Sequence, residues 1–482
     1  MMRLSSNPNL PLWLLTMSLV IGLTAPILIQ AGMFQDGILY SCVSHNLAIG
    51  HGTFWFPQYS TLNIEGIPSF HEQPPLVFGI QSLFFKVLGD SMYVERFYTF
   101  LMLMIHVVLI HIFWKMVFRE NTLYASLSWL PVLFWIGVPV CFWSFRHNMI
   151  ENTMSVFTLS AVILGYKAIQ SLQPRIGLWI LSGFFIFLAT FSKGIPGFFP
   201  ITFPFIYWLF TRKISFASCC LYTAILIGVP VILYSTLLFF PDSRKSLSIY
   251  FFDRLLMRVN ARPTADYRLQ IVWRLLNELI PILVATAILV TLKWKSFKSG
   301  FSSHQSLFWV FFVVAMAGTL PLTLTMVQNG WYMVPAFPFI AMSFAILIMP
   351  VIADWISQVR TENRGYKFSL FITAFLLGGV LVFTSMQKGK ISRHADIIHD
   401  VKIIGSVVPR WSTLTIPYEM YDQYYFVLQG LLVRDYNISI SPYQQYDFYL
   451  KEKRFTSKPP SNYVPVDIGL IKYDFFRNQY VE

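Results

Sequence analysis

The sequence predicts an α-helical polytopic membrane protein that ends in a small α/β soluble domain on the outer face. Hydrophobic residues make up 55% of the 482 positions and charged residues only 12%, whereas soluble domains carry roughly a quarter charged residues. The mean hydropathy is +0.57. The net charge of +13 fits basic cytoplasmic loops, so no nucleic-acid partner is expected. Four cysteines without a CxxC pair imply neither a zinc site nor a disulfide framework.

The apolar runs and the basic gaps between them predict the topology. The first run follows Arg3 and is expected to be an uncleaved signal anchor. Basic residues mark every second gap, which places the N-terminus inside and the C-terminus outside. About eleven spans are predicted, with a range of about 11 to 13. The runs lie near residues 10–31, 97–118, 123–143, 150–169, 176–192, 195–211, 216–240, 274–292, 305–327, 331–352 and 367–386.

One apolar stretch, PPLVFGIQSLFFKVLG at 74–89, is too short to cross a bilayer easily. Counting it as a crossing would also invert every later basic loop. We therefore expect an outer-face helix that dips into the membrane and begins at its two prolines, which suit a first helical turn.

The composition changes near Gln387, where the apolar runs give way to alternating patterns typical of strands and amphipathic helices. The sequence thus predicts two domains. Residues 1–386 form a membrane domain with outer loops 32–96 and 241–272, and residues 387–482 form an extracytoplasmic α/β domain.

Carboxylates, histidines and many cations gather on the predicted outer face, and this is the first functional signal. Charge next to lipid is costly, so a chain that retains it there is expected to use it. The outer-face residues are Asp36, His45, His51, Glu65, His71, Glu72, Arg96, Arg146, His147, Glu151, Lys193, Arg244, Lys245, Arg254, Arg258, Arg262 and Arg268.

Two motifs in the first outer loop each allow a structural and a functional interpretation. Asp36 in QDG is either the N-cap of a helix that begins at Gly37 or a general base or substrate ligand. HEQPPL places His71 and Glu72 beside a rigid Pro-Pro corner. That segment is either a surface loop or part of a site, and His71 and Glu72, with Glu65, are candidates for a divalent metal.

Three later motifs carry cations. Arg146 and Glu151 in SFRHNMIENT could form a mutual ion pair. Lys193 in FSKGIPGFFP could extend to lipid headgroups or bind a ligand that the neighbouring glycines allow to approach. The amphipathic segment LSIYFFDRLLMRVNARP, with Arg254 and Arg258 one turn apart, could be an interfacial helix or could bind a lipid phosphate.

These stretches, in this order, resemble the GT-C superfamily of membrane glycosyltransferases, in particular the branch of the protein O-mannosyltransferases and the aminoarabinose transferase that modifies lipid A. QDG, HEQPPL, FRHNMIEN, SKGIPGFFP and WYMVPAFPF match its motifs over roughly residues 10–350, and the soluble tail resembles the aminoarabinose branch. Two positions depart from the pattern. Gln73 replaces a lysine before Pro-Pro, and Gly37 replaces a second acid.

The resemblance implies a glycosyltransferase that moves a sugar from a polyprenyl-phosphate donor to a lipid or protein acceptor at the outer face of the cytoplasmic (inner) membrane. The leaving phosphate needs cations around it, and the acceptor hydroxyl needs a base. One base and direct displacement imply inversion. The expected catalytic residues are Asp36, Glu72 and Glu151. The expected substrate-binding residues are His71, Arg146, Lys193, Arg254, Arg258, Arg262 and Tyr332.

Two other classes of protein are weighed against this one. A transporter or flippase of lipid-linked sugars would be expected to carry charges in mid-membrane, and few occur deep within the predicted spans. A receptor-like scaffold would use its tail to bind a partner. Neither class explains outer carboxylates opposite an arginine-rich loop. No cofactor is certain, with a divalent metal as the one candidate. Membrane lipids are further expected partners.

Overall fold

The computed structural model describes residues 7–62, 69–171, 173, 175–256, 263–422 and 425–480. Contacts divide the chain into two compact units, each predominantly of one architecture. The helical unit comprises Met1–Ile27, Thr99–Arg146 and Ile150–Gln387. The α/β unit comprises Leu28–Tyr98, His147–Met149 and Lys388–Glu482.

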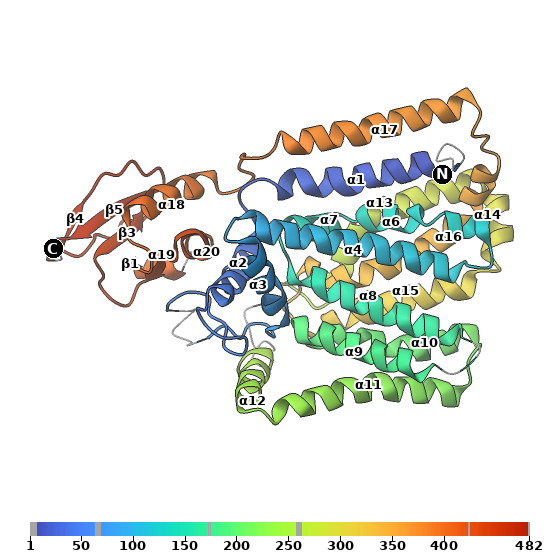
Figure 1. The fold of residues 1–482 in the computed structure, drawn as a ribbon, viewed down its shortest axis with the longest axis horizontal. Helices are drawn as coiled ribbons and strands as arrows, with labels where there is room; N and C mark the ends of the chain where they lie inside the picture. The colour runs from blue at the N-terminus through green and yellow to red at the C-terminus, as the bar shows by residue number, and fades with distance from the viewer. Residues whose placement is uncertain are drawn as a thin grey trace. The chain divides into compact units, whose positions relative to one another are not determined.

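The helical unit is a bundle of long apolar helices (Figure 1). Among the described residues, eight helices are long and apolar enough to span a bilayer, or nine if the bent pair α6 and α7 is one span. The elements are α1 (Leu10–Leu28), α4 (Tyr93–Val117), α5 (Thr122–Ser126), α6 (Trp129–Ile136), α7 (Pro139–Arg146), α8 (Ile150–Ile169), α9 (Ile176–Lys193), η2 (Ile195–Thr202), α10 (Phe203–Thr211), α11 (Phe216–Leu238), α12 (Pro241–Ser248), η3 (Ile249–Leu255), α13 (Gln270–Leu292), α14 (Trp294–Phe301), α15 (Gln305–Thr319), η5 (Leu320–Leu324), η6 (Gly330–Ala336), α16 (Phe337–Ser357) and α17 (Arg364–Ser385).

The predicted fold class is confirmed, and the number of spans differs from the predicted eleven for two local reasons. The run at 150–169 forms α8, which is less apolar than a span because it buries Glu151, Asn152 and Thr153 in the bundle. The run at 195–211 begins as the 3₁₀ helix η2, with prolines in it, and continues as the short helix α10. Buried polar residues thus lower the hydropathy of the first run, and prolines interrupt the α-helix of the second. Hydropathy alone counts both runs as spans.

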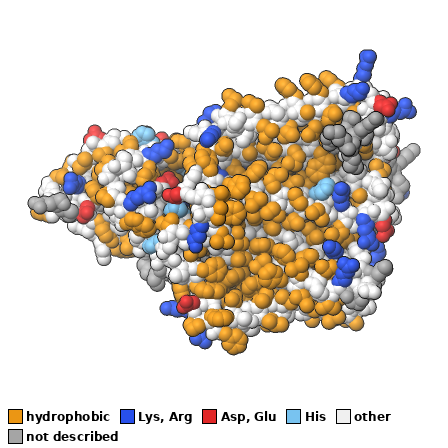
Figure 2. All heavy atoms as spheres, in the orientation of Figure 1, with side chains coloured by type: hydrophobic (Ala, Val, Ile, Leu, Met, Phe, Trp, Pro, Cys, Tyr) orange, Lys and Arg blue, Asp and Glu red, His pale blue; other side chains and the backbone are white. Residues whose placement is uncertain are grey.

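Burial orders the helices within the bundle. In the span Gly330–Ser357, which contains η6 and α16, 94% of the most apolar stretch is buried, whereas none of that in α17 is, so α16 is central and α17 peripheral. Figure 1 shows α17 running beside α1, where Gly22 meets Val380. Figure 2 shows hydrophobic side chains covering the side of this bundle, with Lys and Arg at its end. Figure 1 shows the turns after α10 and α16 at the same end of the bundle, as the pattern of basic residues predicts.

The α/β unit joins the soluble tail to the segment that follows α1. Its sheet has the order β2-β1-β3-β5-β4, in which β1 runs parallel to β2 and β3, while β5 runs antiparallel to β3 and β4. The elements are α2 (Gln35–Ala48), α3 (Leu76–Leu88), α18 (Ala395–Val407), β1 (Thr413–Thr415), α19 (Tyr418–Asp422), α20 (Phe426–Tyr436), β2 (Ser439–Ser441), β3 (Phe448–Glu452), β4 (Tyr463–Pro465) and β5 (Tyr473–Asn478).

Close packing of α20 on α2 makes this unit continuous. Cys42 Sγ donates to the carbonyl of Gly430 at 3.0 Å. A Cβ on Gly430 would lie 2.7 Å from Ile38, so the helices approach as closely as a glycine allows. The chain passes from the helical unit to the α/β unit near residue 387, where the sequence predicts a domain boundary. The α/β unit also includes residues 28–98. The predicted division into two domains stays a prediction.

Candidate functional site

The residues Lys193 and Gly194 of the SKGIPGFFP motif form a tight turn, which places Lys193 at the end of α9 in the helical unit. Gly194 follows with φ of +83°, and a Cβ there would lie 2.0 Å from the hydroxyl of Tyr250. At Gly197 a Cβ would lie 2.6 Å from the backbone of Ala189. Both positions therefore require glycine, because the chain folds back against α9 and against Tyr250.

Lys193 and Glu151 form a buried ion pair. Lys193 Nζ donates to Glu151 Oε1, and the two side chains are 5% and 0% exposed. Glu151 stands in the first turn of α8, where the helix dipole favours a carboxylate. Its other oxygen, Oε2, is buried without a hydrogen-bond partner among the described residues. Lys193 Nζ also lies 4.5 Å from the ring centroid of Tyr332, a cation–π contact.

An apolar cavity of about 520 Å³ opens beside this pair. Lys193, Tyr250 and Tyr332 bring polar atoms to its wall, and the Tyr250 hydroxyl donates to the Lys193 carbonyl at 3.4 Å. The apolar wall includes Phe199, Leu255, Ala317, Pro321, Leu322 and Val327. A cation at the edge of an apolar cavity suits an amphiphilic anion.

The structure contradicts two of the interpretations that the sequence left open, one for Arg146 and one for Lys193. Arg146 does not pair with Glu151, because its Nε donates to the Leu23 carbonyl at 2.5 Å and its guanidinium stacks 4.6 Å from the Phe142 ring centroid. Lys193 does not extend to lipid headgroups, because its ammonium is buried against Glu151. Both alternatives are therefore wrong.

The arginine-rich segment is described only in part. Residues 249–255 form the π-helix η3 instead of an α-helix, and Arg254 in it is half-buried and has an interaction partner. The next residue, Leu255, lines the cavity. Arg258 and Arg262 lie outside the described residues.

Asp36 belongs to the α/β unit, in the first turn of α2. The N-cap position is Phe34 and the helix begins at Gln35, so Asp36 is not the cap residue. A Cβ on Gly37 would lie 1.9 Å from the His147 carbonyl. No second acid therefore fits at residue 37, which explains that departure from the GT-C pattern. His147 Nδ1 also accepts the Phe34 N–H at 3.2 Å.

The HEQPPL corner is in the same unit. Pro75 occupies the N-cap of α3, as a proline-started helix predicts. His71 is buried with Nε2 2.6 Å from Ser69 Oγ, and Glu72 is half-buried with a polar contact. Within the described ranges no three His, Cys, Asp or Glu side chains gather as metal ligands. Glu65 lies outside those ranges, so the described residues provide no metal site around His71.

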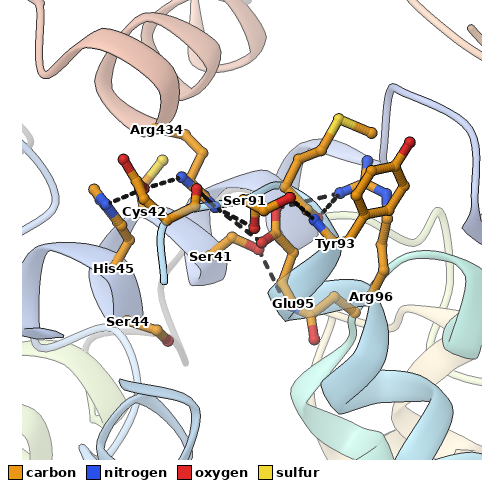
Figure 3. Close-up of polar contacts among 12 residues, drawn as sticks. Ser41, Cys42, Ser44, His45, Ser91, Tyr93, Glu95, Arg96 and Arg434 are labelled. Atoms are coloured by element: carbon orange, nitrogen blue, oxygen red, sulfur yellow. Dashed lines mark hydrogen bonds and ion pairs between the residues drawn. The ribbon is translucent and has the colours of Figure 1, made fainter. Parts of the chain in front are cut away.

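A second ionic cluster, which the sequence did not reveal, surrounds Arg434 on α20 (Figure 3). Arg434 Nη1 donates to Asp90 Oδ1 and Nη2 donates to Glu95 Oε2, both at 3.1 Å. His45 Nε2 lies 2.6 Å from Asp90 Oδ1. Burial lowers the pKa of His45, and Arg434 lowers it further, against the opposing effect of Asp90. Because the partners stand more than 300 residues apart, no local motif could signal this cluster.

Comparisons with known proteins agree with the motifs. A family model described as dolichyl-phosphate-mannose-protein mannosyltransferase matches residues 72–237. No curated protein is significantly similar in sequence. ArnT from Cupriavidus metallidurans bound to undecaprenyl phosphate superposes with a TM-score of 0.62 at 11% identity, over 96% of this chain and 97% of that one.

A second solved structure is more distant. The archaeal oligosaccharyltransferase AglB from Archaeoglobus fulgidus, in complex with an inhibitory peptide and a dolichol-phosphate, superposes with a TM-score of 0.52 at 11% identity. The match covers 92% of this chain and 69% of that one. At such identities the likeness concerns the fold. The resemblance that the motifs predicted is thus confirmed, and this chain has the fold of the GT-C superfamily of membrane glycosyltransferases.

Proposed function

We propose that this protein is a glycosyltransferase that moves a sugar from a polyprenyl-phosphate carrier to an acceptor at the extracytoplasmic face of the cytoplasmic membrane. The observation that carries the proposal is the buried Lys193 ammonium at the wall of an apolar cavity among apolar helices. Two proteins of the same fold have been solved with such carriers, ArnT with undecaprenyl phosphate and AglB with dolichol-phosphate.

Lys193 is the proposed ligand of the carrier phosphate. An ammonium has three donors; one binds Glu151, so others remain for phosphate oxygens. The carrier phosphate gains negative charge as the glycosidic bond breaks, and a fixed cation stabilises it more in the transition state than in the ground state. Glu151 and Tyr332 hold the ammonium in place, and Arg254, Arg258 and Arg262 supply further positive charge in the proposal.

The apolar cavity is the proposed site of the first isoprene units of the carrier. Each buried methylene contributes about 0.8 kcal/mol, so a cavity of this size gains several kcal/mol from a branched hydrocarbon chain. Aromatic and branched walls such as Phe199 and Leu322 suit isoprene methyl groups. The phosphate at the cavity wall would then lie within reach of the ammonium.

Asp36 is the proposed general base for the acceptor hydroxyl. A phosphate leaving group departs as a stable anion and needs no acid, so one base suffices, and a direct displacement inverts the sugar centre. Glu72 and His71 are the proposed contacts to sugar or acceptor. The acceptor is a lipid or a protein. Mass spectrometry of envelope lipids and of glycoproteins from cells with and without the gene would identify it by the product that disappears.

Carrier binding can be tested on the purified protein by thermal unfolding with undecaprenyl phosphate, and with undecaprenol as the uncharged control. A ligand at 100 times its Kd stabilises by about 2.7 kcal/mol. We expect stabilisation of the parent by the phosphate form. The Lys193→Met variant should respond equally to both lipids. Equal responses to both lipids in the parent would contradict a phosphate site.

The proposed orientation places the basic turns inside and residues 388–480 outside. In a Cys220→Ser background, which removes the exposed native thiol, an impermeant maleimide should label a cysteine at the exposed Ser406 in intact cells. A cysteine at the exposed Ser303 should react only after lysis. The reverse pattern would place the proposed site on the wrong side of the membrane.

A further inference from the structure

The segment that leads into Asp36 is held by the tail of the chain. Ala31 N–H donates to the Lys390 carbonyl at 2.8 Å, and Ser392 N–H donates to the Ala31 carbonyl at 2.9 Å. Gly32 has φ of +91°, and a Cβ there would lie 2.6 Å from the Arg393 carbonyl. Five residues before Asp36, the backbone is thus fixed by the strand-like pairing of residues 31 and 391.

Arg96 fixes the same segment from another side. Its Nε donates to the Gln30 carbonyl at 3.1 Å, and its Nη1 donates to the Met92 carbonyl at 2.7 Å. The side chain is buried, and its charge is balanced by Glu95 Oε1 at 3.2 Å. These partners fix the position of the buried guanidinium. The position of Gln30 therefore depends on Glu95, because Glu95 holds Arg96 in place.

Glu95 connects this arginine to the C-terminal helix α20. Its second oxygen, Oε2, accepts from Arg434 Nη2 at 3.1 Å, so one buried carboxylate binds both guanidiniums. Arg434 also donates to the carbonyls of Asp90 and Ser91 at 3.1 and 3.2 Å, at the turn between α3 and α4. Figure 3 shows Arg434, Glu95 and Arg96 following one another in this way.

We propose that Arg434 is a positioning residue for sugar transfer, because it holds the segment before Asp36 in place through Glu95, Arg96 and Gln30. The C-terminal region then contributes to transfer through its hold on α2. The inference rests on the proposed function, in which Asp36 is the base. Removing Arg434 leaves the buried Glu95 with Arg96 alone and frees the α3–α4 turn, so the segment relaxes. A misplacement of about 1 Å at a reacting group can cost about 10²-fold in rate.

Hydrogen–deuterium exchange tests the connection without any assay of activity. We expect Arg434→Met and Arg96→Met to raise deuterium uptake in residues 29–36, with uptake in the central helix α16 unchanged. The matched control is Arg410→Met, which removes an exposed arginine from the same C-terminal region. Unchanged uptake in residues 29–36 of the Arg434 variant would overturn the proposal. If Arg434→Met does not fold, Arg434→Lys keeps the charge but not the forked set of bonds.

Transfer kinetics test the consequence. We expect Arg434→Met to lower kcat about tenfold or more with the KM for the carrier donor within about twofold, because the carrier cavity belongs to the helical unit. Residues that act through one connection are not additive, so Arg434→Met/Arg96→Met should lose no more than the worse single variant. Multiplying losses, or a kcat equal to that of the Arg410 control, would overturn the positioning role. A parent protein without transfer activity, but with the expected exchange differences, would instead count against the proposed function.

Discussion

The molecule has two ionic clusters with a buried cation, and they differ in how many hydrogen bonds the cation makes and in what lies beside it. Arg434 donates from both terminal nitrogens to four acceptors on Asp90, Ser91 and Glu95, while its Nε is buried without a hydrogen-bond partner among the described residues. Lys193 has one carboxylate oxygen and one aromatic ring, Glu151 Oε2 has no hydrogen-bond partner among the described residues, and a cavity of about 520 Å³ lies alongside.

This difference separates a structural cluster from a binding site. A buried charge is costly unless it is hydrogen-bonded, and the two terminal nitrogens of Arg434 have four acceptors that offset this cost. Among the described residues, Lys193 Nζ donates to Glu151 alone, and the apolar cavity beside it suits a ligand of matching charge and hydrocarbon. Buried ion pairs are weak evidence for stability. The cavity beside an ion pair is more informative than the number of such pairs.

The largest effect is expected at Asp36, which belongs to neither cluster. Asp36→Asn should lower transfer by about 10²- to 10⁴-fold, the usual contribution of a general base, with the protein still inserted and folded. The control is Asp396→Asn, because Asp396 also stands in the first turn of a helix, so both variants lose a similar dipole interaction of about 0.3–1 kcal/mol. Equal activity of the two variants in a transfer assay would reject Asp36 as the base.

The next effect distinguishes the two clusters directly. Lys193→Met removes a charge proposed to stabilise the leaving phosphate, and such losses cost about 10²-fold or more in kcat. Arg434→Met should lower kcat less and leave donor affinity unchanged. Steady-state kinetics with a purified polyprenyl-phosphate sugar would show the order. A larger loss of kcat at Arg434 than at Lys193 would reverse the assignment of structural and binding roles.

Local patterns in the sequence were enough to predict the helical membrane fold, the helix behind Pro75 and the strand-rich tail. Charge and the neighbouring glycines also made Lys193 and Glu151 candidates; the fold pairs them with each other, and their roles in a site stay a prediction. The cavity was not predictable, because η2, η3 and the region after α15 meet only in the folded chain. Tyr250 was missed for the same reason. The alternating pattern of STLTIPYEMY at 412–421 predicts a strand throughout, whereas the chain forms β1 over Thr413–Thr415 and then helix α19 over Tyr418–Asp422. Arg434 was missed because its partners lie about 340 residues earlier.

Unfolding experiments can sharpen the comparison at the level of stability. Lys193→Met alone leaves Glu151 as an uncompensated buried charge and should cost about 3–5 kcal/mol of unfolding free energy. The double variant Glu151→Gln/Lys193→Met removes both charges and should recover most of that loss in stability, while the loss of transfer remains. Chemical denaturation in detergent would measure both. A double variant that is no more stable than Lys193→Met would mean that the ion pair itself stabilises the fold.

The smallest expected effect concerns the cavity. Ala317 lines it on α15, so Ala317→Trp should fill part of the space proposed for the isoprene chain. Losing the burial of one or two methylenes at about 0.8 kcal/mol each corresponds to roughly a tenfold rise in donor KM. Because Ala317 belongs to the apolar part of the wall, kcat should change little. Ser306→Trp, at an exposed position near the start of the same helix, is the matched control. The comparison of the two clusters depends on the cavity binding the carrier. If the Ala317 variant has the same donor KM as its control, the cavity does not bind the isoprene chain. Lys193 would then be a buried charge without a ligand, and the two clusters would differ only in the geometry of their contacts.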